Sequence, residues 1–366
     1  MKKLEENSNR IDSFDLLKTI SIFCVIFYHG WTATTISPNN FSFINSFNYF
    51  IKSFLSICVP TFFLVNGALL LNKSLDIKKH CKKILKLFLL VIAWDIIDVF
   101  LHMLFNGKLL SLPEFLQKAL TFELDWSNQL WFLMALIVVY LFFPLIKCTY
   151  DNNAKSYKFF LIITLILTFG NTIISMSSNI VLFLIGGTPI VYEINFFGEL
   201  NPFRGIYGYT LVYFMLGGIL YTEKYNIKLR KNSNIYILII PFCMLLFTLY
   251  ASMMIYTANI KFDIVWKGYD TIFCLFNTIA LYFIASKYKY TKKPIHKLIQ
   301  LISQNTMGIY LLQTSIILFT KPAFRTLGIS SYLLPNFIYV LMVLLICLVL
   351  CLLIKKLPLI KIIINL

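Results

Sequence analysis

The sequence predicts an all-α, polytopic membrane protein, and three observations support this: the composition, the length of the apolar runs and the placement of the basic residues. Of the 366 residues, 59% are hydrophobic and only 13% are charged, whereas a soluble domain has about 25% charged residues. The apolar residues come in runs of about 18 to 22, long enough to cross a hydrocarbon core about 30 Å thick. We therefore expect an integral-membrane bundle of about ten transmembrane helices.

The apolar windows follow one another along the whole chain. They lie near 15–34, 50–71, 84–105, 129–147, 158–177, 207–222, 234–256, 269–286, 300–320 and 334–354. A further apolar stretch, 179–192, is short and contains two glycines and a proline, so we interpret it as an external or re-entrant segment and not as an eleventh span. The prediction is one integral-membrane domain over residues 1–366, with a short cytoplasmic tail at 1–13.

The basic residues predict the orientation of these spans. Many of the 33 Lys and Arg residues lie in the connecting stretches 73–86, 223–231 and 287–297, which share one side of the membrane if the spans alternate. Loops on the cytoplasmic side are enriched in Lys and Arg, so both termini are expected in the cytoplasm of a multi-pass inner or plasma membrane protein. Topology and contact with membrane lipid account for the net charge of +17, and no nucleic-acid partner is expected.

Two other classes of feature are not expected. The eight cysteines and four histidines are scattered along the chain without a CxxC or Cys/His cluster, which predicts neither a disulfide framework nor a metal site. The first apolar run is longer than the core of a usual signal peptide and is followed by further spans, so we interpret it as a membrane helix that is retained.

The first span carries two ionisable residues on one face. Lys18 and His29 are eleven positions apart, which places them within roughly 20° of each other and about 16 Å apart along a helix. An ionisable residue within a membrane usually faces the bundle interior or a wet cavity, and so marks a functional site. The alternative is that Lys18 extends to the lipid headgroups and His29 caps the outer interface.

Two further clusters of polar residues suggest a site. Asp95, Asp98 and His102 share one face of the third span and are expected to orient His29, to bind an acceptor, or to pair with Lys52 as structure. The stretch FELDWSNQLWF at 122–132 groups carboxylate, amide and aromatic side chains, which suits a carbohydrate. The alternative for its tryptophans is an interfacial aromatic belt.

Several stretches resemble the acyltransferase-3 family of membrane proteins, which acylate sugars and cell-envelope glycans. DLLKTISIFCVIFYHG (15–30) resembles the family's first helix, an arginine followed after ten residues by a histidine, with Lys18 in the arginine position. VPTFFLVNGALLL (59–71), the basic KKHCKKILK (78–86) and YGYTLVYFMLGGIL (207–220) resemble later family segments. In QLWFLMALIVVYLFFPLI (129–146) and MGIYLLQT (307–314), Gln129 and Gln313 replace family histidines.

This resemblance implies a membrane O-acyltransferase. It would move an acyl group, expected to be acetyl, from cytoplasmic acyl-coenzyme A to a hydroxyl of an envelope polysaccharide, glycan precursor or lipid-linked sugar, with no bound cofactor. His29 is expected to be the general base. The expected donor site comprises Lys18, Lys79, Lys82 and Lys83. The expected acceptor cavity comprises Asp95, Asp98, Asp125, Gln129, Trp131, Tyr310 and Gln313.

The departures from the family pattern keep other functions open. Lysine keeps the charge of arginine but loses its planar fork, and glutamine keeps hydrogen bonding but does not titrate. The principal alternative is a non-catalytic exporter of a polysaccharide or small metabolite on the same scaffold. Another is a structural partner within a glycan-synthesis complex.

Overall fold

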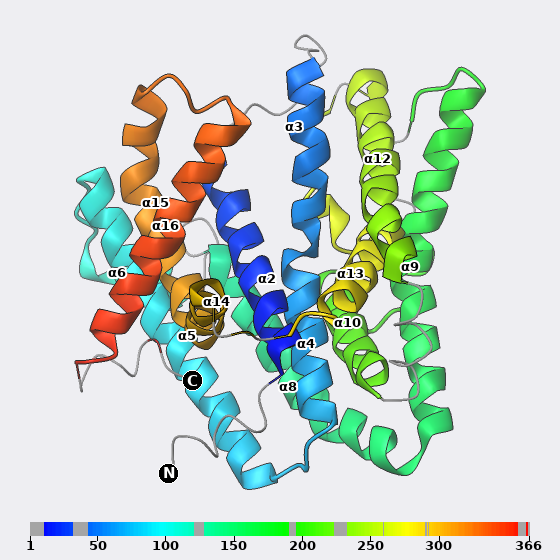
Figure 1. Cartoon of the computed structure of the whole chain (residues 1–366), viewed down its shortest axis with the longest axis horizontal. Coiled ribbons are helices and arrows are strands. Elements are labelled where there is room, and N and C mark those ends of the chain that lie inside the picture. The colour runs from blue at the N-terminus through cyan, green and yellow to red at the C-terminus, as the bar shows by residue number, and fades with distance from the viewer. Residues whose placement is uncertain are drawn as a thin grey trace.

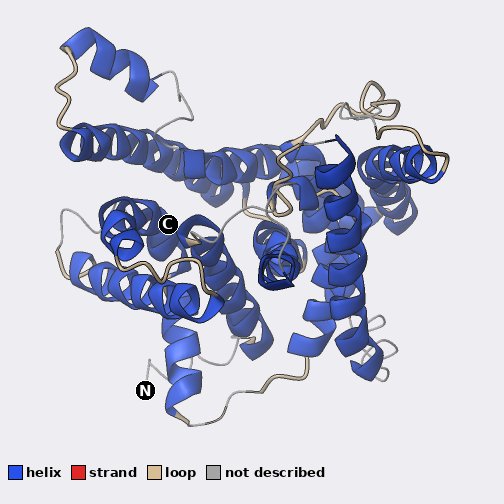
Figure 2. Cartoon of the chain, turned by 90° about the horizontal axis from the view of Figure 1, so that it is seen from above, coloured by secondary structure: helices blue, strands red, loops and turns tan. Residues whose placement is uncertain are grey.

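The structure is a computed structural model that describes residues 11–31, 43–120, 128–189, 195–222, 233–258, 260–289, 291, 293–357 and 364. Figure 2 shows that these residues form helices joined by turns and loops, with no strand among them. Each of the ten apolar windows overlaps at least one helix, so the all-α prediction is confirmed.

The helices have the following bounds: α2 (Asp12–Gly30), α3 (Phe43–Phe54), η1 (Leu55–Ile57), α4 (Cys58–Leu71), α5 (Ile77–Asn106), α6 (Leu112–Leu120), η2 (Asn128–Leu130), α8 (Trp131–Asn152), α9 (Ala154–Leu184), α10 (Ile206–Tyr221), α12 (Ser233–Ala258), η3 (Trp266–Gly268), α13 (Ile272–Ala285), α14 (Pro294–Gln304), α15 (Thr306–Thr326) and α16 (Leu333–Ile354).

Within the described residues, six helical segments are long and apolar enough to cross a membrane: α2, the continuous segment Phe43–Leu71, α8, α9, the Ile235–Ala258 part of α12, and α16. The apolar helices α10 and α13 are shorter. Helices α5 and α15 carry charged side chains within their length. The prediction of about ten spans with both termini in the cytoplasm stays a prediction.

Two expectations about individual segments are wrong. The window 300–320 is not one helix, because the chain breaks at Asn305 between α14 and α15. The stretch 179–192 is expected to be external or re-entrant; its first part continues α9 without a break through Leu184, so it is not a separate re-entrant segment, and its external position stays a prediction. Gly186, with φ of 78°, lies in the turn after this helix, where the left-handed conformation favours glycine.

Helices α4 and α10 pack with their backbones in close approach, and glycines make this approach possible. A Cβ atom at Gly67 would lie 1.7 Å from the carbonyl oxygen of Phe214, and one at Gly217 would lie 2.0 Å from the carbonyl oxygen of Leu64. Small residues let helix backbones approach in this way, which replaces side-chain packing by direct backbone contact. The α4 side of this pair packs against α2.

Helix α2 occupies the centre of the bundle (Figure 1) and contacts α4, α13, α14, α15 and α16. The N-terminal ends of α2, α5 and α15 lie toward the lower end of the molecule in Figure 1, and their C-terminal ends lie toward the upper end. The central helix can therefore connect features at the two ends of the bundle.

Candidate functional site

Three cavities follow one another along α2 and α15. The lower cavity, about 270 Å³, lies at the N-terminal ends of these helices and is lined by Lys18 and Lys83. The middle cavity, about 280 Å³, shares Tyr310 with the lower one. The upper cavity, about 390 Å³, shares His29 with the middle one. The series thus joins the two ionisable residues of the first helix.

The lower cavity has a polar wall formed by α4, α5 and α8. Lys83 Nζ donates a hydrogen bond of 3.1 Å to the Tyr140 hydroxyl and lies 4.8 Å from the centre of its ring. The Tyr140 hydroxyl in turn donates to Asn66 Oδ1 at 3.4 Å. Lys18 lines the same cavity. Two lysines from different helices therefore face one space at this end.

The other two predicted donor residues lie elsewhere. Lys79 and Lys82 are exposed, and the Lys79 ammonium lies 3.3 Å from the Asp76 carboxylate. Asp76 caps α5 by accepting a hydrogen bond from the backbone N–H of Lys79, and this bond holds the pKa of the Asp76 carboxyl below its usual value. Of the four lysines predicted for the donor, the structure brings together Lys18 and Lys83.

The middle cavity places aromatic residues around His29. Trp131 and Trp266 line it, with ring centroids 5.2 Å apart in an edge-to-face arrangement. The hydroxyl of Tyr28, which precedes His29, donates a hydrogen bond of 2.6 Å to Asp263 Oδ2. This bond ties the end of α2 to the segment that follows α12. Trp131, which was predicted for the acceptor cavity, lines the same cavity as His29.

The upper cavity contains a network of buried hydrogen bonds. Gln129 Nε2 donates to Asp98 Oδ2, and the Ser315 hydroxyl donates to Asp98 Oδ1 at 3.4 Å. The Tyr310 hydroxyl donates to the backbone carbonyl oxygen of Gln129. Asp98 and Gln129 are 3% and 4% exposed, so this buried network holds η2, which precedes α8, against α5 and α15 beside the cavity.

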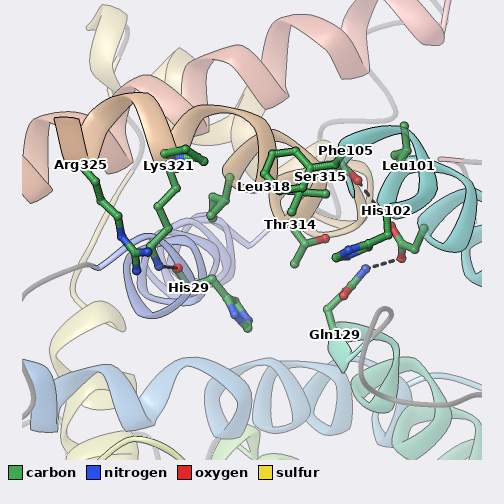
Figure 3. Close-up of a pocket in the computed structure, with 13 residues that line it drawn as sticks. His29, Leu101, His102, Phe105, Gln129, Thr314, Ser315, Leu318, Lys321 and Arg325 are labelled. Atoms are coloured by element: carbon green, nitrogen blue, oxygen red, sulfur yellow. Dashed lines mark hydrogen bonds between the residues drawn. The ribbon is translucent and has the colours of Figure 1, made fainter. Parts of the chain in front are cut away.

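Two basic residues of α15 face His29 from the opposite wall. Lys321 Nζ donates hydrogen bonds to the backbone carbonyl oxygens of His29, at 2.7 Å, and Trp31, at 3.3 Å. A cation is favourable at the C-terminal end of a helix, where carbonyl groups lack helical partners. Figure 3 shows Lys321 and Arg325 reaching from α15 toward α2, and the His29 ring pointing into the space between them and Gln129.

The remaining predicted residues fall outside these cavities or outside the described residues. Asp95 is buried on α5, but it is not among the residues that line the three cavities. Gln313 is fully buried, and neither polar atom of its amide has a hydrogen-bond partner within the described part of the chain. Asp125 lies outside the described residues. Lys52, considered above as a partner of the third-span carboxylates, lies 5.8 Å from the centre of the Tyr28 ring.

Reasoning from the sequence missed the residues of α15 beyond Gln313. Ser315, Lys321 and Arg325 all line the upper cavity. The signal was present, since Tyr310, Thr314, Leu318, Lys321 and Arg325 recur at spacings of three and four and so share one helix face. Following this helix face beyond residue 314, where the resemblance to the family ends, would have added Lys321 and Arg325 to the predicted site.

Comparison with known families tests the resemblance stated above. A family model described as an acyltransferase domain, that of acyltransferase-3, matches residues 11–356. No curated protein and no solved structure matches the chain. The family match covers nearly the whole chain, including every helix that lines the three cavities. The chain therefore belongs to the acyltransferase-3 family and is a multi-pass membrane acyltransferase.

Proposed function

We propose that this protein transfers an acyl group, acetyl in the simplest case, from cytoplasmic acyl-coenzyme A to a hydroxyl of an envelope glycan or its lipid-linked precursor. The observation that carries the proposal is the position of His29 at the junction of the middle and upper cavities. His29 lines both the middle cavity, which shares Tyr310 with the lower cavity of Lys18, and the upper cavity, which Arg325 also lines.

The residues at each end support the direction of transfer. Lys18 and Lys83 supply positive charge for the phosphates of the coenzyme at the end of the bundle predicted to be cytoplasmic. At the other end, Gln129, Ser315 and Arg325 provide amide, hydroxyl and guanidinium groups that suit sugar hydroxyls. This arrangement favours donor entry from below and acceptor entry from above, in an inner or plasma membrane.

The proposed reaction uses His29 as the general base. The acceptor hydroxyl oxygen attacks the thioester carbonyl carbon, and the imidazole takes the hydroxyl proton. The C–S bond then breaks, the ester forms, and the imidazolium returns the proton to the departing thiolate. A positioned general base contributes about 10² to 10⁴ in rate.

The test is transfer of label from radiolabelled acetyl-coenzyme A to the glycan fraction of membranes. The variants are the native chain, His29→Ala, and His296→Ala as a matched control, because His296 stacks on Tyr288 and does not line any of the three cavities. All must be present at equal levels. Label with the native chain and His296→Ala, but not with His29→Ala, supports the proposal. Equal label in all three contradicts the role of His29.

A transporter on the same scaffold is the second candidate, and two observations favour it. Gln129 and Gln313 do not titrate, and a series of cavities between the two ends of the bundle also suits a moving cargo. The two functions differ in stoichiometry, since an enzyme consumes one acyl-coenzyme A for each product and a transporter moves its cargo without doing so. Measuring free coenzyme A release alongside glycan label separates them.

A further inference from the structure

A second site lies between α9 and α12 and shares no lining residue with the series of cavities. On the inward side of this helix pair is a polar pocket of about 360 Å³. On the outward side is an apolar groove of about 480 Å³. Met176 of α9 and Tyr250 of α12 line both spaces, so the two spaces meet at this pair of side chains.

The apolar groove faces the surface that a membrane would cover. It is lined by large apolar residues of both helices, among them Ile180, Phe183 and Leu249, which are exposed in the structure. Of the six segments that could span a membrane, α9 is the least buried. A groove on the lipid-facing surface of a spanning helix can receive a hydrocarbon chain, and this one lies between α9 and α12, with Ile272 and Phe273 of α13 (Ile272–Ala285) also lining it.

The polar pocket has the chemistry of a headgroup site. Side chains with amide or hydroxyl groups line it, and one of them, Asn179, is 4% exposed and donates a hydrogen bond of 3.1 Å to the Tyr250 hydroxyl. Lys261, Lys267 and Asp270 also line the pocket, so it carries more positive than negative groups. The amides and hydroxyls suit a sugar, and the lysines suit a phosphate.

The polar pocket lies beside the middle cavity. Trp266 and Lys267 are consecutive in η3, and the first lines the middle cavity while the second lines the polar pocket. Phe262 and Asp263 are also consecutive: Phe262 lines the polar pocket, and Asp263 accepts a hydrogen bond from Tyr28, the residue before His29. A headgroup in this pocket would therefore be separated from the aromatic wall near His29 by one segment of chain.

We propose that α9 and α12 form a lateral binding site for a single-chain lipid that carries a sugar through a phosphate. The hydrocarbon chain lies in the apolar groove, the phosphate and sugar enter between Met176 and Tyr250, and the headgroup occupies the polar pocket. The role of this lipid as carrier of the acceptor rests on the proposed function, but its binding does not.

The test measures saturable binding of tritiated farnesyl-phosphoglucose to the full-length chain in phosphatidylcholine nanodiscs. Ser177 lines the groove and is exposed, so Ser177→Trp fills the groove without disturbing a buried position. Ile162→Trp is the matched control, because Ile162 is an exposed residue of the same helix outside the groove. We expect Ser177→Trp to weaken binding about tenfold or more, and Ile162→Trp to bind as the native chain does.

Competition experiments with fragments of the probe and with a second lipid test which parts of the ligand the site recognises. Farnesol supplies the tail alone, and inorganic phosphate with glucose supplies the head alone; neither is expected to displace the probe at concentrations where unlabelled farnesyl-phosphoglucose does. Displacement by a two-chain phosphatidylglycerol at the same concentration overturns the proposal. So does unchanged binding in Ser177→Trp.

A measurement on the unaltered chain guards against misfolding of the variant. A farnesyl-phosphoglucose analogue with a benzophenone in its chain is expected to label peptides from 173–184 and 246–253; labelling elsewhere overturns the site. The same binding assay on His29→Ala separates this proposal from the enzymatic one, because His29 lines neither the pocket nor the groove and its loss should leave probe binding unchanged. Binding with no glycan acylation in the native chain sinks the proposed function, whereas acylation with no binding sinks the lateral site.

Discussion

The lower and upper cavities each present two basic side chains, but they hold them differently. At the lower end, Lys83 contacts the hydroxyl and ring of Tyr140, and Lys18 comes from a different helix. At the upper end, Lys321 is committed to two backbone carbonyl groups at the end of α2. The lower lysines line the cavity wall, where the proposed function would have them meet the donor as point charges. The upper lysine instead fixes the helix end that carries His29, which leaves Arg325 to face the cavity.

The largest effect is expected at the buried network of the upper cavity. Asp98→Ala removes the acceptor for both Gln129 and Ser315, and each unsatisfied buried group costs about 1 to 3 kcal/mol. We expect a lower melting temperature in detergent and about a 10²-fold fall in transfer, because displaced groups beside His29 lose the productive geometry. Asp98→Asn, which retains one acceptor, should be less affected. Native activity in Asp98→Ala would show that the network does not position the site.

The next effect tests whether Lys321 acts through α2. Lys321→Met removes the donor to the carbonyl groups of His29 and Trp31, and a charge-assisted hydrogen bond contributes about 1.5 to 3 kcal/mol. We expect kcat to fall about tenfold, since ~1.4 kcal/mol of lost positioning corresponds to that factor, while KM for acyl-coenzyme A stays unchanged. Lys321→Arg keeps charge and donors and should restore most of the rate. If Lys321→Met changed only KM for acyl-coenzyme A, the prediction would be wrong, because Lys321 would then behave as expected of the lysines of the lower cavity.

A smaller effect, of the opposite kind, is expected at the lower cavity. Lys18→Ala should raise KM for acyl-coenzyme A about five- to tenfold with little change in kcat, because it removes a point charge from the donor end. The difference in KM between Lys18→Ala and the native chain should become smaller in high salt, because salt screens the attraction between Lys18 and the donor in the native chain. Lys18→Arg is the charge-preserving control. Loss of kcat with an unchanged KM would assign Lys18 to the chemistry instead.

The smallest effect is expected for the exposed lysines outside the lower cavity. Lys79→Ala and Lys82→Ala alter exposed side chains that do not line the cavity. We expect KM for acyl-coenzyme A to stay within about twofold of the native value, since exposed charge contacts are weak. Lys83→Ala, measured in parallel, should resemble Lys18→Ala. If all four lysines gave equal changes in KM, the donor would be held by the general positive charge of the loop and not by the cavity.

The helices could be predicted from sequence because apolar runs of membrane length report helices directly. Their interruptions could not. The break at Asn305 falls inside an apolar window, and the continuation of α9 to Leu184 runs through a stretch whose glycines and proline suggested an earlier end. In both cases the local composition around the boundary gave the wrong signal, because tertiary packing determines where a membrane helix stops.

The candidate site was predicted in part, for a similar reason. Spacing on α2 predicted that Lys18 and His29 share one face, and the resemblance added Gln129, Trp131 and Tyr310; all five residues line the three cavities. The partners that span the fold were not predictable: Ser315 is 217 residues from Asp98, and Asp263 is 235 residues from Tyr28. No periodicity within one helix reports contacts between helices so distant in sequence.

The glycine contact between α4 and α10 has a consequence for how such a protein can diversify. At Gly67 and Gly217 even a methyl group would collide with the backbone of the facing helix, so a substitution at either position requires the two helices to move apart. Substitutions that alter the proposed acceptor site would therefore fall on α5, on α15, or along residues 260–271 beside η3. The molecule thus separates a wall closed to mutation from walls on which selection can act.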